Sequence, residues 1–316
     1  MKNVQIILII SIILLSGCEK NVDFSGKEPS PKIVVNSIIN TQSDTSLIKI
    51  SESVFDYSSQ EPGIVENPEI HLNINGEECN QLCLDTVVGI HTYYKVVANL
   101  NVGDKVELSA HTQKHGTVKG YDNVPDTAEI KNIETSWFKK DGRSYLRLYV
   151  TLKDSPGERN FYRIIVKSKA DMIHPSFQEP LEYWSFSKIF IEDEMLFQSL
   201  TEKDEGGKSP NFYRIFTDEL FQGKEYTLNV YIQYDNYAEN PDADYVRQYI
   251  KVEIHTLSEK LYQNLHSQEL ASGMATGDIF YEPVKIYTNM QGGYGILGIY
   301  NVTEKEKLVA EKGCSI

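Results

Sequence analysis

Thiol and imidazole side chains are the first candidates for chemistry in this chain, which contains 4 cysteines and 7 histidines. Cys18 stands apart because residues 15–18 read LSGC and end an apolar run that follows the basic Lys2. A basic start, a short apolar run and small residues before the cleaved bond are typical of a signal peptide, so we predict that Cys18 becomes a lipidated N-terminus. A transmembrane anchor is the alternative, but a span needs about 20 apolar residues, and this run is followed by the polar residues 19–21.

The other cysteines would lie in the oxidising envelope compartment that such an anchor implies. Cys79 and Cys83 are close enough in the sequence to close a small loop, so we predict a disulfide between them. A zinc site would need two further ligands, and no Cys-x-x-Cys or paired His motif lies nearby. Cys314, near the C-terminus, is expected to have no role.

The histidines form no recognisable catalytic or metal-binding motif. His111 and His115 are four residues apart, but only a helix would place them on one face, and they flank a predicted strand and its Gly116 turn. We therefore expect both to be solvated. The chain also lacks a Gly-x-Ser-x-Gly elbow and a His-Glu-x-x-His sequence, the usual local signatures of serine hydrolases and zinc proteases. We predict no catalytic residues, no metal and no cofactor.

Acidic pairs are the remaining route to hydrolysis, since glycosidases need two facing carboxyl groups. Residues 192–194 and the loop 235–244 are acidic, but neither has a spacing that fixes such a pair. The loop also lacks the ligand spacing and central glycine of an EF-hand calcium site. We interpret it as solvated, and a β-sandwich hydrolase is the least favoured function.

Aromatic side chains are the better candidates for binding, because the chain has 20 Tyr, 12 Phe and 2 Trp. Such rings can stack on sugars or cover a partner protein at little cost in rotamer entropy. The candidates lie in a stretch with two prolines and beside the acidic loop; they are Phe177, Tyr183, Trp184, Tyr234 and Tyr237. Core packing is the alternative for Trp184, Phe186 and Phe190, which share one strand parity. Phe177 and Tyr237 are expected to be exposed.

Apolar and polar residues alternate along most of the chain, and this pattern predicts an all-β architecture. Val106, Leu108 and Ala110 alternate with polar residues, as strands with one buried face do. The segment 122–127 contains an X-Pro step, which favours an extended chain, and its acidic and polar residues have no core to join. We therefore predict that it is a linker. The predicted divisions are a signal peptide (1–17), a lipidated tether (18–31), an immunoglobulin-like sandwich (32–121), this linker, and a larger antiparallel β-sandwich (128–316) with one α-helix, about 258–271, capped by Ser258.

The net charge of −14 makes the surface repel nucleic acid. Hydrophobic residues make up 41% of the chain, which is enough for packed cores. Together these values favour a folded envelope protein over a nucleic-acid-binding or disordered one.

Five stretches, in a fixed order, carry a resemblance to a known family. They are PKIVVN (31–36), PGERNFYR (156–163), TDELFQGKEY (217–226), LSEKLY (257–262) and EPVKIYTN with the following GYGILG (282–289 and 293–298). In these stretches the chain resembles the Bacteroidetes lipoproteins grouped as domain-of-unknown-function family 4249. It departs from the usual pattern in Cys79 and Cys83 and in a long stretch around 171–211.

The resemblance implies an envelope lipoprotein that is all-β apart from a C-terminal helix and is often encoded beside SusCD-type TonB-dependent transporters. It brings no catalytic residues. We therefore expect an outer-membrane lipoprotein, facing the cell exterior, that is an accessory binding subunit of a SusCD-like nutrient-uptake complex; its partners would be the transporter and its lipoprotein lid. A lipoprotein that binds a glycan or peptide on its own is the alternative.

The matched motifs themselves are interpreted as structural. Gly293, Gly295 and Gly298 would permit a positive φ or a close backbone approach. A phosphate-binding loop is the alternative, but these glycines precede a strand, and no helix N-terminus follows them.

Overall fold

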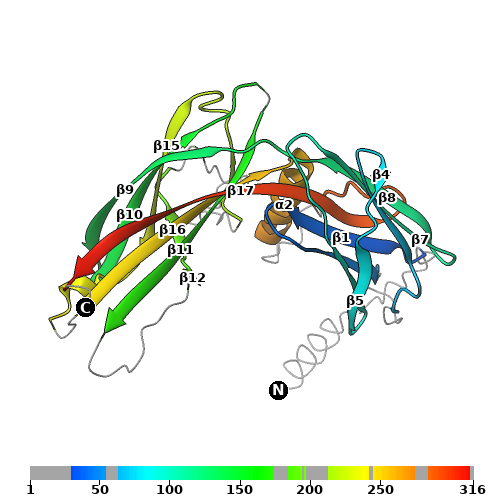
Figure 1. Ribbon diagram of the computed structural model, residues 1–316, viewed down its shortest axis with the longest axis horizontal. Helices are drawn as coiled ribbons and strands as arrows, with labels where there is room; N and C mark the ends of the chain where they lie inside the picture. Colours follow the sequence, from blue (N-terminus) through cyan, green and yellow to red (C-terminus); the bar gives the residue numbers. More distant parts are fainter. Residues whose placement is uncertain are drawn as a thin grey trace, which may run out of the picture.

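The computed structural model describes residues 30–54, 63–157, 159–173, 184–193, 196, 213–241, 245–274 and 284–313. Within these ranges the chain is all-β with one α-helix, as predicted. Two lobes are joined by one long strand, β17 (Tyr294–Lys312), which crosses from one to the other (Figure 1).

The described strands form three sheets. A nine-stranded sheet, here the shared sheet, has the order β12-β11-β16-β17-β1-β2-β6-β5, with β14 also paired to β11. The N-terminal sheet has the order β4-β3-β7-β8, and the C-terminal sheet has the order β13-β15-β10-β9.

The element bounds follow chain order. In the first lobe they are β1 (Ile33–Asn40), β2 (Ser46–Glu52), β3 (Glu69–Ile74), β4 (Glu77–Glu78), β5 (Leu82–Val88), β6 (His91–Val96), β7 (Lys105–Thr112) and β8 (Gly116–Asn123). In the second they are β9 (Glu129–Lys140), β10 (Arg143–Lys153), β11 (Phe161–Ile173), β12 (Ser185–Phe186), β13 (Ile189–Ile191), β14 (Ile215–Thr217), β15 (Glu225–Gln233), the 3-10 helix η1 (Tyr237–Glu239), β16 (Tyr245–Leu257) and the helix α2 (Glu259–Met274).

Strand β17 belongs to both lobes. Its first part pairs with β1 in parallel, and its later part pairs with β16 in antiparallel register. Leu297 and Ile299 consequently lie in the first hydrophobic core, together with Met290 from the segment before β17. The sequence assigned everything after residue 127 to the second sandwich, so these residues correct that division.

Each lobe buries the alternating apolar residues that predicted its strands. Val106, Leu108 and Ala110 are fully buried in the first core, and Leu146 and Leu148 are fully buried in the second. Both cores lie against the same face of the shared sheet, because Leu297, Ile299 and Val309 have the same parity along β17.

The predicted linker is not solvated. Asp122 and Val124 are both buried, and the Asp122 carboxylate accepts hydrogen bonds from the Ser258 hydroxyl and from Ile299 N (3.1 Å). The prediction was wrong because it assumed that an acidic stretch with a proline has no hydrophobic core to pack against. Side chains of β17 and α2 offer its polar groups buried partners instead.

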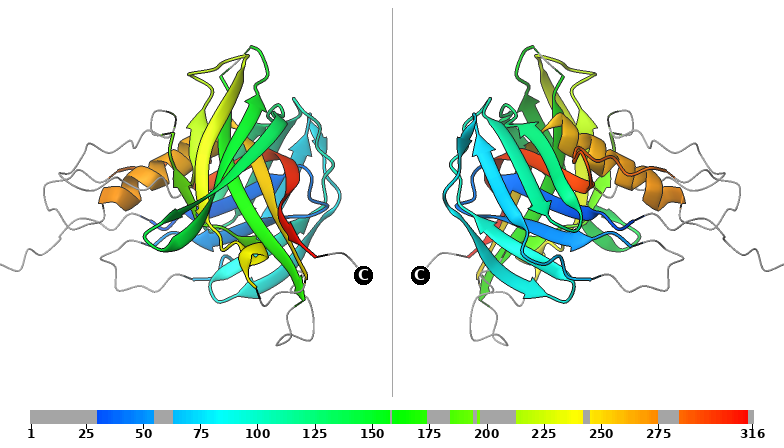
Figure 2. Two further views of the ribbon diagram at one scale, coloured as in Figure 1. Left: turned by 90° about the vertical axis from the view of Figure 1, so that its left-hand side faces the viewer. Right: turned by 90° about the vertical axis from the view of Figure 1, so that its right-hand side faces the viewer.

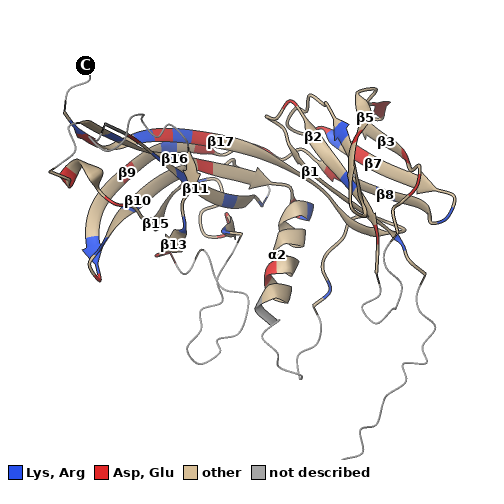
Figure 3. Ribbon diagram, turned by 90° about the horizontal axis from the view of Figure 1, so that it is seen from below, with Lys and Arg blue, Asp and Glu red and all other residues tan. Residues whose placement is uncertain are grey.

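Helix α2 begins against the opposite face of the shared sheet, where Leu261 packs on Leu257, and it projects away from that sheet (Figure 3). Ser258 caps it as predicted, because its hydroxyl accepts a hydrogen bond from Leu261 N (3.2 Å). The segment 284–290, which lies between α2 and β17 in the chain, was predicted as a strand but pairs with none. It is fixed to α2 instead, since Asn264 donates to Tyr287 O (2.7 Å) and Tyr287 N donates to Ser267 Oγ (2.8 Å).

Gly295 allows β17 to approach β1. Its φ is +107°, and a Cβ at this position would lie 1.9 Å from Val35 O. The G295A substitution should therefore cost about 2–4 kcal/mol of the free energy of unfolding, through backbone strain and a steric clash. G142A is the matched control, because Gly142 has a φ of +73° with nothing within 4 Å of the added Cβ, and it should cost only about 1 kcal/mol. Equal losses in urea unfolding of the two variants would contradict this account of the β1–β17 contact.

Asp122 should make stability depend on pH. Burial raises the pKa of this carboxyl from 3.8 to about 6, although the hydrogen bond from Ser258 opposes the shift. Between these values the folded chain retains the proton that the unfolded chain loses, so the contribution of Asp122 to stability falls as pH rises from about 4 to about 6. The D122N variant lacks this term. The wild type should therefore lose up to about 3 kcal/mol relative to D122N across that window, measured by urea unfolding at pH 4, 5, 6 and 7. Parallel curves for the two proteins would refute it.

Candidate functional site

The structure places some of the predicted site residues and leaves others outside its described ranges. Cys18, Phe177 and Tyr183 lie outside them. Trp184 precedes β12 and is half-buried, with its ring centroid 5.2 Å from Lys251 Nζ.

The two tyrosines beside the acidic loop are not exposed binding residues. Tyr234 is only 8% exposed, and its hydroxyl donates to Lys169 O (2.7 Å). Tyr237 lies in η1 and packs half-buried against the second core, while its amide donates to Gln248 Oε1 (2.8 Å). The prediction that Tyr237 is exposed was wrong because the chain after β15 folds back over the core.

Core packing was the alternative prediction for Trp184, Phe186 and Phe190, and it is wrong for Phe186. This side chain is 76% exposed on the short strand β12, where its ring lies 5.1 Å from Lys167 Nζ. Trp184 and Phe190 are half-buried. Strand parity alone therefore did not decide their environment, because β12 and β13 belong to different sheets.

The predicted disulfide is absent, since Cys79 and Cys83 are both free thiols. Cys79 follows β4, packs against the first core and donates its Sγ–H to Val97 O (3.4 Å). Cys83 is exposed on β5, opposite Lys95 of β6 in the shared sheet. The two thiols are held by different sheets, which a short spacing in the sequence does not reveal.

His115 also differs from its predicted environment. Its side chain is only 4% exposed, with Nε2 lying 3.1 Å from a Glu52 carboxylate oxygen and Nδ1 lying 3.0 Å from Pro31 O. His111, in contrast, is exposed on β7. His115 thus ties the start of the described chain to β2 and is not a solvated loop residue.

Four aromatic rings lie side by side on the outer face of the C-terminal sheet. One comes from each strand, and together they form what we call the aromatic strip: Phe190, Tyr231, Tyr145 and Phe138. Phe190 stacks on Tyr231 with centroids 4.9 Å apart, and Tyr145 stacks on Phe138 at 5.3 Å. The two stacked pairs meet edge to face, with 5.6 Å between Tyr145 and Tyr231. The left view of Figure 2 looks onto this lobe.

The alternation of β10 and β15 orients the strip. Leu146 and Val230 enter the second core, so Tyr145 and Tyr231, at neighbouring positions, point the other way. Phe138, Tyr231 and Phe190 are half-buried, whereas Tyr145 is mostly covered by the rings around it.

A charged pair borders the strip. Arg147 donates two hydrogen bonds to Glu192, each 2.7 Å, and its guanidinium carbon lies 4.7 Å from the Phe138 ring centroid. The hydrogen bonds from Arg147 to Glu192 raise the pKa of the guanidinium. On the other side, Lys188 Nζ lies 5.3 Å from the Phe190 ring. The rings and Arg147 are therefore held in place before any partner arrives.

Apart from the phenols of Tyr145 and Tyr231, the strip contains no side chain that could act as a nucleophile or general base. Tyrosine, phenylalanine and arginine in a fixed cluster are instead typical of the residues that dominate binding between proteins. Sequence reasoning missed the strip because its members are far apart in the chain. The available signal was parity: Tyr145 and Arg147 occupy the positions that alternate with core leucines.

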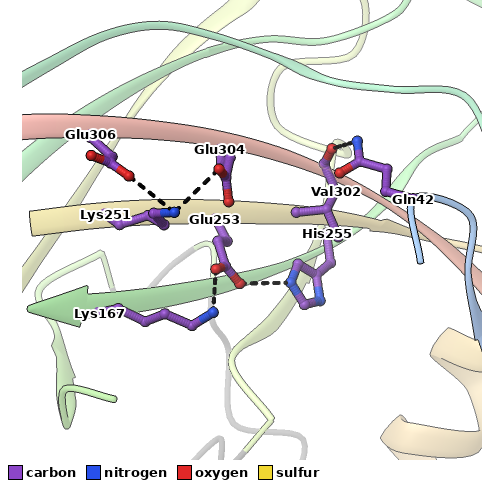
Figure 4. A network of polar contacts seen from close by, with 8 residues as sticks. All are labelled: Gln42, Lys167, Lys251, Glu253, His255, Val302, Glu304 and Glu306. Carbon is purple, nitrogen blue, oxygen red and sulfur yellow. Dashed lines mark hydrogen bonds and ion pairs between the residues drawn. The ribbon is translucent and has the colours of Figure 1, made fainter. Parts of the chain in front are cut away.

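A second polar cluster lies on the face of the shared sheet that carries α2 (Figure 4). Glu253 joins Lys167 to His255, whose Nε2 lies 3.3 Å from the Glu253 carboxylate. Lys251 is paired with Glu304 (3.2 Å) and Glu306 (3.0 Å). Figure 3 shows basic and acidic residues alternating along this part of β17.

His255 is a buried neutral base. Burial lowers its pKa from 6.5 to about 4, although Glu253 opposes the shift, and its ring stacks on Tyr300 with centroids 4.7 Å apart. Burial alone would raise the pKa of Glu253, but hydrogen bonds from Lys167 and His255 hold it below its usual value. In the part of the chain that the structure describes, no group of three or more His, Cys, Asp or Glu residues could hold a metal ion. We interpret the cluster as structural.

The pH dependence of His255 should oppose that of Asp122. Between pH 6.5 and about 4, His255 is protonated in the unfolded chain but stays neutral in the folded one. Its contribution to the free energy of unfolding is therefore lost as pH falls through this window. The wild type should lose up to about 3 kcal/mol relative to H255Q between pH 7 and pH 4, measured by urea unfolding. A difference that is constant with pH would show that the imidazole is not buried in its neutral form.

Comparisons with known proteins give a family and a distant structural likeness. The family model described as "Domain of unknown function (DUF4249)" matches residues 19–306. No curated protein sequence matches the chain. A crystal structure of a DUF4785 family protein from Legionella pneumophila is similar at 12% identity with a TM-score of 0.22, and the alignment covers 70% of this chain and 51% of that one. The chain thus spans about half the length of that protein. No helix among the described residues is long and apolar enough to cross a membrane.

Proposed function

This chain belongs to the DUF4249 family, and we propose that it is a lipid-anchored, non-enzymatic binding subunit of a SusCD-like TonB-dependent uptake complex in the outer membrane. The resemblance of its sequence to envelope lipoproteins suggests the setting, and the LSGC sequence ending at Cys18 suggests the anchor. The observation that carries the proposal is the aromatic strip with its bound Arg147.

The strip supports contact with a protein partner for two reasons. Its rings are already packed against one another, so a partner would immobilise few side chains on binding. Tyrosine and arginine are also the residue types that contribute most to binding energy when an interface removes them from water. The proposed partners are the transporter barrel and its lipoprotein lid.

The lipid anchor makes a modest contact sufficient. Two proteins held in one membrane meet at a high effective concentration, so a single patch can maintain a complex that would dissociate in dilute solution. The tether that precedes the fold, predicted as residues 18–31, would let the strip turn toward its partner.

The test is a pull-down of the native lipidated protein from its own outer membrane in mild detergent, followed by mass spectrometry. A TonB-dependent barrel and its lipoprotein lid should be recovered in stoichiometric amounts with the wild type. The double variant Y231S/F190S should reduce that recovery at least tenfold, because each loss of an interface anchor costs about 2 kcal/mol.

T151A is the matched control, since Thr151 lies on the same strand and same face as Tyr145 and its hydroxyl pairs only with that of Thr227 (3.0 Å). It should leave recovery unchanged, and near-ultraviolet circular dichroism would verify that all variants are folded. Recovery of the wild type alone, in detergent that preserves other envelope complexes, would reject the proposal. Equal recovery with Y231S/F190S would reject the strip as the contact.

A further inference from the structure

A second surface lies on the other lobe, where the face of the shared sheet that carries α2 continues across β1 and β2. An open groove of about 450 Å³ lies there. Its floor is made by Asn36, Ile38 and Asn40, alternate residues of β1, and by Leu47 of β2. This volume lies within the usual range of about 300–1,000 Å³ for sites that bind small ligands.

The groove is uncharged although the chain carries a net charge of −14. Its polar groups are amides and hydroxyls, those of Asn36, Asn40, Ser43, Thr45 and Ser46. Among the described residues, the Asn36 amide and the Thr45 hydroxyl have no hydrogen-bond partner, so both remain free to bind a ligand. Lys49, opposite Asn36, and Lys95, opposite Leu47, border this part of the sheet, but neither lines the groove.

Tyr300 forms one wall of the groove. Its ring stacks on His255 of β16 with an angle of 18° between the planes, and the groove lies on the other side of β17, over β1. The ring also packs against the cluster around Leu257 and Leu261, and the part of it that stays uncovered lines the groove. Ile38 and Leu47 add aliphatic surface, with 47% and 49% of their side chains exposed.

The turn between β1 and β2 is held against β17, so the groove exists before a ligand binds. Thr41 N donates to Tyr300 O (3.2 Å), and the Gln42 amide donates to Val302 O, as Figure 4 shows. Within the turn, Ser43 Oγ donates to Thr45 O (2.8 Å). A preformed wall lowers the entropic cost of binding.

From these features we propose that the groove binds a neutral oligosaccharide. Aromatic surface such as that of Tyr300 packs against the C–H groups of a sugar ring, and amides with hydroxyls pair with sugar hydroxyls. A peptide fits less well, because β1 is paired on both sides and offers no free main-chain groups for strand addition. This site does not depend on the transporter contact, since it lies on a different sheet.

The test uses the purified lipidated protein in a detergent without a sugar headgroup. Isothermal titration calorimetry would measure maltohexaose, cellohexaose, mannohexaose and xylohexaose, with a galacturonate hexamer and a Gly-Ser hexapeptide as the charged and peptide probes. At least one neutral hexasaccharide should bind with a micromolar to millimolar Kd. N36A should weaken that binding at least tenfold, Y300A should do the same, and Y300F should retain it because the ring face is kept.

Y294A is the matched control, because Tyr294 lies on the same strand with 45% of its surface exposed but outside the groove. It should bind as the wild type does. N36A keeps the test valid even if Y300A unfolds, since Asn36 supports no other described side chain. Absence of binding by all four neutral probes, preference for the charged or peptide probe, or binding indifferent to N36A would each overturn the proposal. None of these results would bear on the pull-down of the transporter.

Discussion

The structure depends on one strand, β17, that pairs with a strand of each lobe. β17 pairs in parallel with β1 at its start and antiparallel with β16 further on, and its residues of one parity face both cores. Leu297 and Ile299 fill the first core, and Val309 packs against the second. Because a strand presents alternate side chains to one face, a shift of one residue would remove all three from their cores together. The two lobes are therefore coupled through the register of one strand, which is regular as far as Leu308 and shifts at Val309.

Between Ile299 and Val309, the residues of β17 that face the cores are polar. Their side chains bind the chain that runs from the linker into β9. Asn301 donates to Asp126 O (3.3 Å), Thr303 donates to Ala128 O (2.7 Å), and Lys305 donates to Lys131 O (2.7 Å). Main-chain carbonyls that cross the seam between two cores need such partners, because an unpaired buried carbonyl costs about 1–3 kcal/mol. Asp122 makes the matching contact to Ile299 N from the first lobe. The linker thus fixes the lobes to each other.

Local patterns in the sequence predicted what depends on neighbours in the chain. The alternation around Leu146 and Leu148 gave a strand with a buried face, and Ser258 gave the start of α2. These local patterns could not predict which strands pair with one another when they are far apart in the chain. Ile296 meets Asn36 across some 260 residues, and nothing near either position indicates a parallel partner. Asp122 was assigned to solvent for the same reason, since its partners come from α2 and β17.

The same limit explains which aromatic residues were found as candidate binding groups. Tyr231 lies on β15 and Tyr234 just after it, and their parity separates them: Tyr234 shares the parity of Val230 and Ile232 and is buried in the second core, whereas Tyr231 lies in the aromatic strip. Parity does not reveal the neighbours of each ring, which are Phe190 of β13 for Tyr231 and Trp137 for Tyr234. Outside a core, other rings and a paired cation hold the rings of the strip in place. Surface aromatic residues should therefore also be sought where strands place them in adjacent register.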